Sequence, residues 1–124
     1  MDTQQKTRVK EVMSTPLETI APSASVKEAA QRMREKDISA LVVTTGPRSI
    51  ITSTDVLDSV AQGEDPTVAE VRDVMTESVE TVTPDLYMEE VAAMMTMYEI
   101  QHLPVVEDGY LGMISSTDVT AQLS

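Results

Sequence analysis

The sequence is organised around Ile51-Thr52-Ser53-Thr54-Asp55-Val56, which occurs again as Ile114-Ser115-Ser116-Thr117-Asp118-Val119. In both copies an apolar segment runs into several hydroxyl side chains, then an aspartate, then an apolar residue suited to open a helix. Serine, threonine and aspartate commonly cap helix N-termini, so one such stretch would carry little information. Two copies, each at the end of a similar segment, indicate a duplicated unit.

The repeat extends through most of the chain. The copies are offset by 62 residues before the last turn and by 63 after it, so the later copy has one extra turn residue. Two further segments recur: Val9-Lys10-Glu11-Val12-Met13-Ser14 as Val71-Arg72-Asp73-Val74-Met75-Thr76, and Glu18-Thr19-Ile20-Ala21-Pro22 as Glu80-Thr81-Val82-Thr83-Pro84. The pattern predicts repeat 1 over residues 9–60, a linker over 61–70 and repeat 2 over 71–123.

Each repeat is predicted to form a strand, a helix, two strands and a second helix, an α/β (α+β) class. Ser25 and Glu28 have the spacing of a capping box for the first helix. In repeat 2, Tyr87 replaces the capping serine, so Asp85 is predicted to cap the corresponding helix. The apolar faces of these helices recur at helical spacing: Val26, Ala29, Ala30 and Met33, then Met88, Val91, Ala92 and Met95.

β-Branched runs predict the central strands, at residues 41–44 and 49–52 in repeat 1 and at 103–106 and 110–114 in repeat 2. Pro104 lacks an amide N–H and is expected at the start or edge of its strand. The closing helix of repeat 1 is expected to begin at Thr54 and Asp55. Its counterpart after Asp118 has six residues left and is expected to be shorter.

The net charge of −12 argues against nucleic acid as a direct partner, because such binding is driven by basic residues that neutralise phosphates. Residues 1–72 contain nine basic and eleven acidic residues, a balance of −2, whereas residues 73–124 contain ten acidic and no basic residues. The acidity has two interpretations: a solvated surface, or adaptation to high ionic strength, where the Debye length falls to about 3 Å at 1 M salt.

Several classes of protein are excluded or disfavoured. The absence of cysteine excludes disulfides, zinc–thiolate sites and cysteine nucleophiles. The start of the chain, residues 1–6, lacks the apolar core of a signal peptide. No apolar run approaches the 18 or so residues of a membrane span, so we expect a cytoplasmic protein without membrane association.

These segments occur in the same order in both repeats, and together they resemble a tandem pair of CBS domains, often called a Bateman module. The resemblance also rests on Ile100-Gln101-His102-Leu103-Pro104-Val105-Val106 and on Gly112-Met113-Ile114-Ser115 with Asp118, and it covers about residues 9–123. It implies two repeats packed about a pseudo-twofold axis with two clefts between them. It also implies a disc-like homodimer and binding of adenosine derivatives such as AMP, ATP or S-adenosylmethionine.

The duplicated stretch has chemistry that suits such a ligand. A helix N-terminus offers unpaired amides and the positive end of a dipole to a phosphate. A carboxylate accepts two hydrogen bonds from a vicinal diol, so Asp55 and Asp118 suit a ribose. Hydroxyl side chains add donors: Thr52 and Thr54 in repeat 1, Ser115 and Thr117 in repeat 2. The resemblance implies the same roles, and the alternative is that these residues only cap helices.

The resemblance assigns the wall around the adenine ring to other elements of each repeat, and pairs the wall of each repeat with the aspartate of the other. The wall residues are Ala21, Val26, Ile38, Ser39 and Ala40 in repeat 1, and Thr83, Met88, Ile100, Gln101, His102 and Pro104 in repeat 2. Core packing is the alternative for the apolar members of this set. Met88 has a soft side chain that suits a flat ring.

Repeat 1 departs from the family pattern, with Ser49 in place of a glycine and Val42 in place of a proline. From Asp73 onward repeat 2 has no basic residue, so only Arg48, Arg72 and earlier basic residues are available to a phosphate. A bare triphosphate would therefore need Mg²⁺. AMP, or a neutral or cationic adenosyl compound, fits the charge better.

The leading hypothesis is a stand-alone regulatory module that binds an adenosyl ligand between the repeats and signals to an effector protein. The alternative is a ligand-free structural or interaction module that acts through its dimer surface. We expect no catalysis, no required cofactor and no metal site, because the sequence has one histidine and no phosphate-binding loop. His102 is expected to be structural or at a ligand edge, and Met94, Met95 and Met97 to lie in a core or dimer seam.

Overall fold

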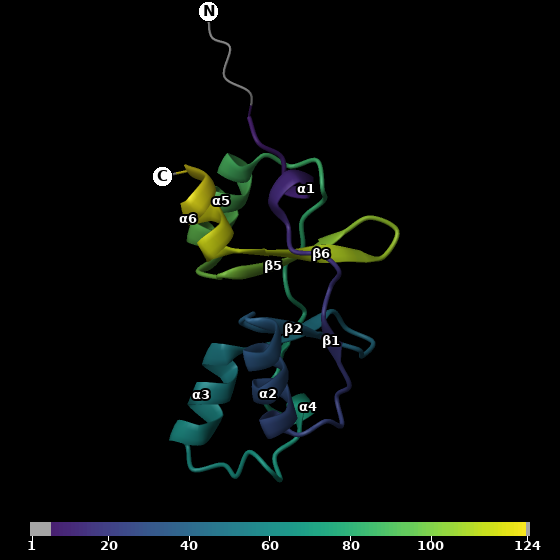
Figure 1. Cartoon of the computed structure of the whole chain (residues 1–124), viewed down its shortest axis with the longest axis vertical. Helices are drawn as coiled ribbons and strands as arrows, with labels where there is room; N and C mark the ends of the chain where they lie inside the picture. Colours follow the sequence, from purple (N-terminus) through teal and green to yellow (C-terminus); the bar gives the residue numbers. More distant parts are fainter. Residues whose placement is uncertain (1–5, 124) are drawn as a thin grey trace, which may run out of the picture. The chain divides into compact units, whose positions relative to one another are not determined.

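The chain forms two compact units in a computed structural model that describes residues 6–123 (Figure 1). Unit 1 comprises Met1–Leu17 with Glu80–Ser124, and unit 2 comprises Glu18–Val79. The opening segments of the two repeats, residues 6–14 and 68–76, therefore each belong to the unit that is built by the rest of the other repeat. The expectation that the chain lacks a signal peptide concerns residues 1–6, of which residues 1–5 lie outside the described part.

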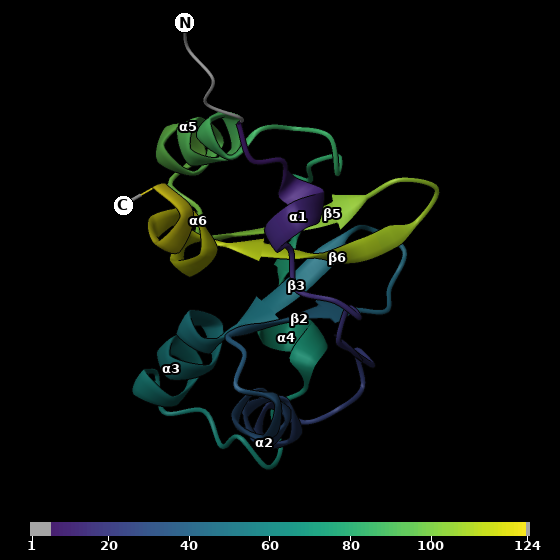
Figure 2. The ribbon, with the colours of Figure 1, turned by 45° about the horizontal axis from the view of Figure 1, so that its top comes forward.

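Unit 2 contains a four-stranded sheet in the order β1-β2-β3-β4. β1 runs parallel to β2, whereas β2, β3 and β4 pair antiparallel. Helices α2, α3 and α4 lie on one face of this sheet (Figure 2). The elements are β1 (Thr19–Ile20), α2 (Val26–Lys36), β2 (Ala40–Val43), β3 (Ser49–Thr52), α3 (Ser53–Ala61), α4 (Val71–Val74) and β4 (Thr76–Glu77).

Unit 1 repeats this topology with shorter outer strands. β5 and β6 pair antiparallel, Val82 forms a parallel bridge to Val105, and Ser14 forms an antiparallel bridge to Met113. The predicted order of elements is therefore confirmed, except that the first strand of repeat 2 is reduced to a single bridge. The elements are α1 (Val9–Val12), α5 (Met88–Tyr98), β5 (His102–Val106), β6 (Tyr110–Ser115) and α6 (Ser116–Leu123).

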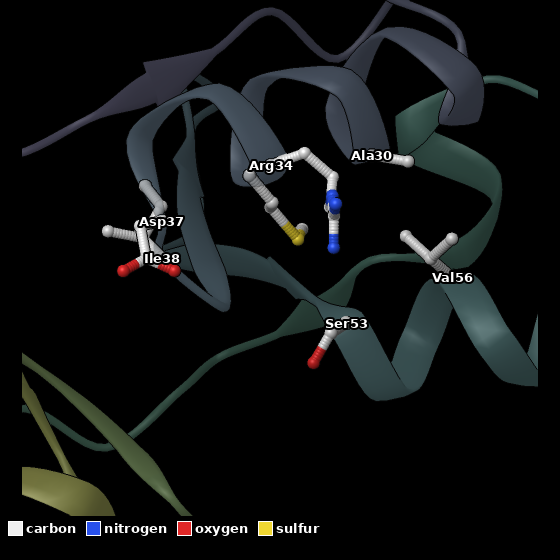
Figure 3. A pocket seen from close by; sticks show the side chains of 7 residues that line it. Ala30, Arg34, Asp37, Ile38, Ser53 and Val56 are labelled. Atoms are coloured by element: carbon white, nitrogen blue, oxygen red, sulfur yellow. The ribbon is translucent and has the colours of Figure 1, made fainter.

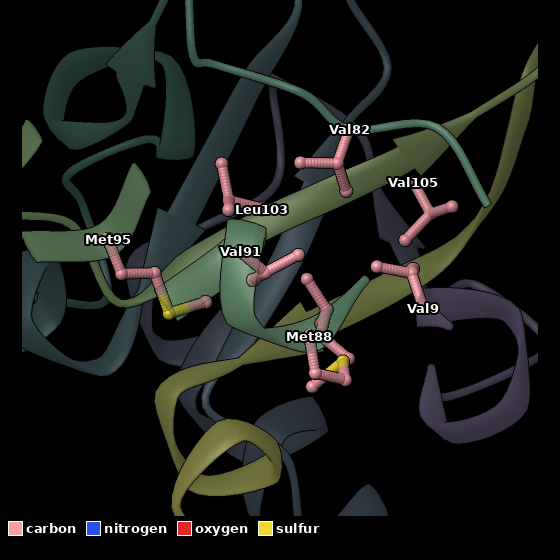
Figure 4. Close-up of a cluster of buried hydrophobic side chains, with 8 residues drawn as sticks. Val9, Val82, Met88, Val91, Met95, Leu103 and Val105 are labelled. Carbon is pink, nitrogen blue, oxygen red and sulfur yellow. The ribbon is translucent and has the colours of Figure 1, made fainter. Parts of the chain in front are cut away.

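Each unit has its own apolar core, and each core includes a valine from an opening segment. Val9 of α1 is fully buried with α5, β5 and β6 in unit 1 (Figure 4). Val71 of α4 is fully buried with α2, β2 and β3 in unit 2. Strand residues and the predicted helix faces complete the cores. Of those faces, Val26, Ala29 and Met33 of α2, and Met88, Val91 and Met95 of α5, are buried, whereas Ala30 and Ala92 are half-buried.

Backbone hydrogen bonds attach the opening segments at equivalent positions. In unit 1 the Val9 amide donates to Leu86 O and the Lys10 amide to Pro84 O. In unit 2 the Val71 amide donates to Ala24 O and the Arg72 amide to Pro22 O. Both sets of bonds use backbone atoms, and the buried valine and the accepting proline carbonyl are the same in the two units. The topology is therefore kept although other side chains differ.

One predicted helix cap is confirmed and one is wrong. Ser25 caps α2 as predicted, because its hydroxyl accepts a hydrogen bond from the Glu28 amide at 3.0 Å. The prediction that Asp85 caps α5 was wrong. Its carboxylate pairs instead with Lys10 at 3.2 Å, and the Tyr87 amide donates to Glu90 at 2.9 Å. α6 has eight residues against nine in α3, so it is not markedly shorter.

Pro104 occupies the third of the five positions in β5, where it breaks no bond to β6. Its carbonyl accepts a hydrogen bond from the Val82 amide at 3.0 Å, on the side of β5 that faces away from β6. The N–H that proline lacks would point to the same side, so the pairing with β6 is unaffected. The extra residue of repeat 2 appears in the adjoining hairpin. Val105 pairs with Gly112 but Val106 pairs with Tyr110, which leaves Leu111 as a bulge.

In the described part of the chain, no helix is both long enough and apolar enough to cross a membrane.

Candidate functional site: two strand–helix junctions

The first junction lies where β3 ends and α3 begins, at Thr52–Asp55. Thr52 is the N-cap, and its hydroxyl accepts a hydrogen bond from the Asp55 amide at 3.2 Å. In return, the Thr52 amide donates to Asp55 Oδ2 at 2.9 Å. This reciprocal capping box explains why α3 begins at Ser53, one residue before the predicted start.

The second junction lies where β6 ends and α6 begins, at Ser115–Asp118. The Ser115 amide donates to Asp118 Oδ2 at 2.8 Å, and the Asp118 amide donates to Ser115 Oγ at 3.3 Å. The Ser115 hydroxyl also lies 3.0 Å from the same Asp118 oxygen. Both junctions therefore have the capping role that the sequence offered as an alternative.

Capping leaves part of each junction available. Asp55 and Asp118 are half-buried, and each uses Oδ2 for its cap. Thr54 and Thr117 are exposed, and their hydroxyls receive no hydrogen bond from residues 6–123. A carboxylate keeps up to four acceptor positions, so capping and binding of a hydroxyl-bearing ligand are compatible.

The two carboxylates have different neighbours. Thr76 Oγ1 lies 3.4 Å from each of the two carboxylate oxygens of Asp55. No hydroxyl of the described residues approaches Oδ1 of Asp118 in this way. Thr76 was not predicted as a site residue, although the duplication aligns it with Ser14 and so indicates an equivalent position in the two repeats.

The predicted wall segments lie beside the junction of their own unit. Ala40 pairs with Thr52, and the Ser53 amide donates to Ser39 O at 2.9 Å. In unit 1, His102 pairs with Ser115, and the Ser116 amide donates to Gln101 O at 2.9 Å. Strand pairing therefore brings the Ser39–Ala40 and Gln101–His102 segments next to the helix starts.

Other predicted wall residues differ in accessibility. Val26 and Met88 are fully buried in their units, Ala40 and Pro104 are buried, and Ile38 and Ile100 are half-buried. Ala21 and Thr83 are exposed at the ends of the first strands. The fully buried side chains contribute to the cores, so an incoming ligand would meet the strand ends rather than Val26 or Met88.

A groove of about 500 Å³ lies between α2 and α3 in unit 2 (Figure 3). Arg34 extends from α2 toward α3, where Ser53 and Val56 lie opposite. Ile38, predicted for the adenine wall, lines this groove. The remaining lining residues are Ala30, Met33 and Asp37. The groove was not predicted from the sequence.

The charge of unit 1 depends on its opening segment. Residues 80–124 contain no lysine or arginine, so Lys6, Arg8 and Lys10 are the basic residues of this unit. Arg8 donates to Asp85 O at 2.7 Å and stacks 4.6 Å from the ring centre of Tyr87. Among residues 6–123, no three acidic or histidine side chains come close enough to hold a metal ion.

Comparison with known proteins identifies relatives of this fold. The family model described as the CBS domain matches residues 9–62 and 71–124. An uncharacterised protein of Methanopyrus kandleri is 32% identical over 117 residues, which are 90% of this chain and 60% of that protein. Inosine-5'-monophosphate dehydrogenase of Korarchaeum cryptofilum is 35% identical over 105 residues, 82% of this chain but 21% of the enzyme. The chain thus spans only part of these relatives.

Solved structures agree with this comparison. The CBS domain pair of protein MJ0100, in complex with 5'-methylthioadenosine and S-adenosyl-L-methionine, has a TM-score of 0.85 and 30% identity over 94% of this chain and 95% of that one. The hexameric CBS-CP12 protein from bloom-forming cyanobacteria has a TM-score of 0.90 and 30% identity over 97% of this chain and 74% of that one. With two matched copies that span nearly its whole length, this chain belongs to the CBS domain family.

Proposed function

We propose that the protein is a regulatory module that binds an adenosyl ligand at its strand–helix junctions, in the clefts that the family resemblance predicts. The observation that carries this proposal is the duplicated junction. Each copy has a half-buried carboxylate at a helix N-terminus and an exposed hydroxyl one residue before it. Asp55 and Asp118 would accept the two hydroxyls of a ribose, and Thr54 and Thr117 would donate to a phosphate or sugar oxygen.

The segments beside the junctions would contact the base. Ser39 and Ala40 in unit 2, and Gln101 and His102 in unit 1, present backbone and side-chain groups at the strand ends. Ile38 and Ile100 are half-buried and would add apolar contact. The complex of MJ0100 with methylthioadenosine and S-adenosylmethionine supports this class of ligand.

Charge favours ligands with few negative groups. The chain has a net charge of −12, and in unit 1 Arg8 and Lys10 are already engaged with Asp85. In unit 1, a bare di- or triphosphate would enter a negative field in which Arg8 and Lys10 are already engaged, unless Mg²⁺ accompanied it. S-Adenosylmethionine, methylthioadenosine and AMP are the better candidates.

The output would be a change in conformation passed to a partner protein. A ligand shifts a conformational equilibrium only by its differential affinity for the two states. We propose a binding rather than a catalytic role. In support, the K. cryptofilum dehydrogenase matches this chain over only a fifth of its own length.

Thermal unfolding with a ligand panel tests the proposal. The panel contains AMP, ADP, Mg·ATP, S-adenosylmethionine and methylthioadenosine, in low and in molar salt. A ligand at 100 times its Kd stabilises the folded state by about 2.7 kcal/mol, which for a chain of this size raises Tm by several degrees. We expect a shift with at least one compound, reduced in Asp55→Asn or Asp118→Asn. A cooperative transition that no compound shifts in either salt would refute the proposal.

A second candidate function, self-association, is favoured by the surface of α3. Ser53 and Val56 line the groove, and Leu57 and Val60 continue the same helix face at 68% and 48% exposure. Exposed apolar side chains beside an open groove are typical of a protein interface. We propose that this face packs against a second copy of the chain.

Sedimentation velocity of Leu57→Asp tests the proposed interface. A buried, unpaired charge at such an interface is costly, so we expect the variant to be monomeric at concentrations where the parent is dimeric. Thr120 holds the equivalent position on α6, and Thr120→Asp serves as the matched control that should leave the assembly unchanged. If the Leu57→Asp variant is still dimeric, α3 is not part of the interface.

A further inference from the structure

Thr76 reaches junction 1 from an opening segment that belongs, in sequence, to repeat 2. β4 pairs antiparallel with β3, and Thr76 stands opposite Ile50, two residues before the N-cap Thr52. The sheet thus fixes the backbone of Thr76 beside the carboxylate of Asp55. The side chain is exposed, so its hydroxyl contributes to the surface that a ligand would meet.

The Thr76 hydroxyl lies across the open edge of the Asp55 carboxylate. Its oxygen is 3.4 Å from Oδ1 and 3.4 Å from Oδ2, and Oδ2 already accepts from the Thr52 amide at 2.9 Å. A vicinal diol bound by a carboxylate donates to both of its oxygens. The Thr76 hydroxyl is therefore within hydrogen-bonding range of both oxygens that such a diol would use.

Junction 2 provides the comparison within the same molecule. Ser14 pairs with Met113 as Thr76 pairs with Ile50, so the two residues are equivalent in register. The Ser14 hydroxyl makes no hydrogen bond with the described residues, and Asp118 Oδ1 accepts none from them. The carboxylate edge is thus covered in one unit and open in the other.

We infer that Thr76 is a specificity-determining residue that competes with the ligand for Asp55 and makes the two junctions unequal in affinity. This inference rests on the proposed function, because it concerns the strength of ligand binding at the same carboxylates. Asp118 is the stronger site, and Asp55 fills only when the ligand displaces the Thr76 hydroxyl. The effect has the size of one ordinary hydrogen bond, about two- to tenfold in Kd.

Calorimetric titration with 5'-methylthioadenosine tests the inference. Thr76→Val has nearly the shape of threonine without its hydroxyl, and an Asp118→Asn background isolates the first junction. We expect Thr76→Val to lower the Kd in this background about two- to tenfold, whereas Thr76→Ser, which keeps a hydroxyl, retains the weaker binding. Ser14→Ala in an Asp55→Asn background is the matched control and should leave the Kd of the second junction unchanged.

The outcomes separate this inference from the proposed function. A Thr76→Val variant that binds no better in the Asp118→Asn background, or does not bind at all, while the parent chain binds, would overturn the role of Thr76 alone. Absence of binding in the parent as well would overturn the proposed function and this inference with it. Equal unfolding transitions of the variants and their backgrounds show that the comparison concerns binding and not folding.

Discussion

The two units share one backbone plan but fill it with different side chains. In unit 2 the opening segment pairs two residues of β4 with β3, and Thr76 reaches Asp55. Within the described residues of unit 1, the opening segment is bridged to β6 at Ser14 alone, and no hydrogen bond joins it to Asp118. The main-chain hydrogen bonds are equivalent in the two units, whereas several side chains differ. The difference teaches that a symmetric fold need not contain two equal sites.

The two units differ most where the opening segment crosses the strand that precedes the junction, at Gly112 in β6 and at Ser49 in β3. Gly112 of β6 is buried, and a Cβ placed on it would lie 2.5 Å from the backbone oxygen of Ser14. The counterpart in unit 2 is Ser49, fully buried, whose hydroxyl donates to Pro47 O at 3.1 Å. Unit 1 thus accepts its opening segment at closer range than unit 2 does.

The largest expected effect comes from closing this space. Gly112→Ala should push the opening segment away from β6 and destabilise unit 1 by about 1–3 kcal/mol, the usual cost of overpacking. Hydrogen exchange measured residue by residue should show lost protection in β6 and α1. Gly46→Ala is the matched control, because a Cβ there meets nothing within 4 Å. Unchanged protection in Gly112→Ala would show that the close approach carries no energetic weight.

The second effect concerns the caps. Ser115 has two hydrogen-bond contacts through its hydroxyl, with the amide and with Oδ2 of Asp118, whereas the Thr52 hydroxyl only accepts from the Asp55 amide. We expect Ser115→Ala to destabilise its helix by about 1 kcal/mol or somewhat more, and Thr52→Ala by less. Denaturant unfolding followed at amides in α6 and in α3 would give both values. A larger loss for Thr52→Ala would reverse this ranking.

The smallest effect should be found at the basic residues of the opening segments. Arg8 stacks on Tyr87 and donates to Asp85 O, whereas its counterpart Glu70 pairs only with the exposed Arg72. Arg8→Gln should destabilise unit 1 by about 0.5–1 kcal/mol, and most of the loss should vanish in molar salt if it is electrostatic. Glu70→Gln is the control and should cost nothing measurable. If Arg8→Gln destabilises unit 1 by the same amount in low and in molar salt, Arg8 acts through packing.

Local signals in the sequence predicted much of the fold. The capping serine of α2, the apolar helix faces and the turn before Tyr110 depend on residues close in sequence, and the structure confirms them. Asp85 was assigned wrongly because its carboxylate pairs with Lys10, which comes from the other end of the repeat pair. Spacing rules for a helix cap do not include such a competitor.

The same reason limits what the sequence indicated about the candidate site. The duplicated stretch identified Asp55 and Asp118, and their capping boxes follow from the three-residue spacing. The contact of Thr76 with Asp55 depends on strand pairing between segments 21 residues apart, and the groove between α2 and α3 depends on how two helices pack. These features come from tertiary structure, which no local pattern encodes.

We propose that the two junction carboxylates bind a ribose-bearing ligand and that Asp118 binds it more tightly. The most direct measurement is a calorimetric titration of 5'-methylthioadenosine into the parent, Asp55→Asn and Asp118→Asn, side by side. Loss of a charge-assisted hydrogen bond weakens binding by about 10- to 150-fold. We predict that Asp118→Asn removes the tighter phase and Asp55→Asn the weaker one. If both variants fold and bind the ligand as the parent does, neither carboxylate is part of the binding site.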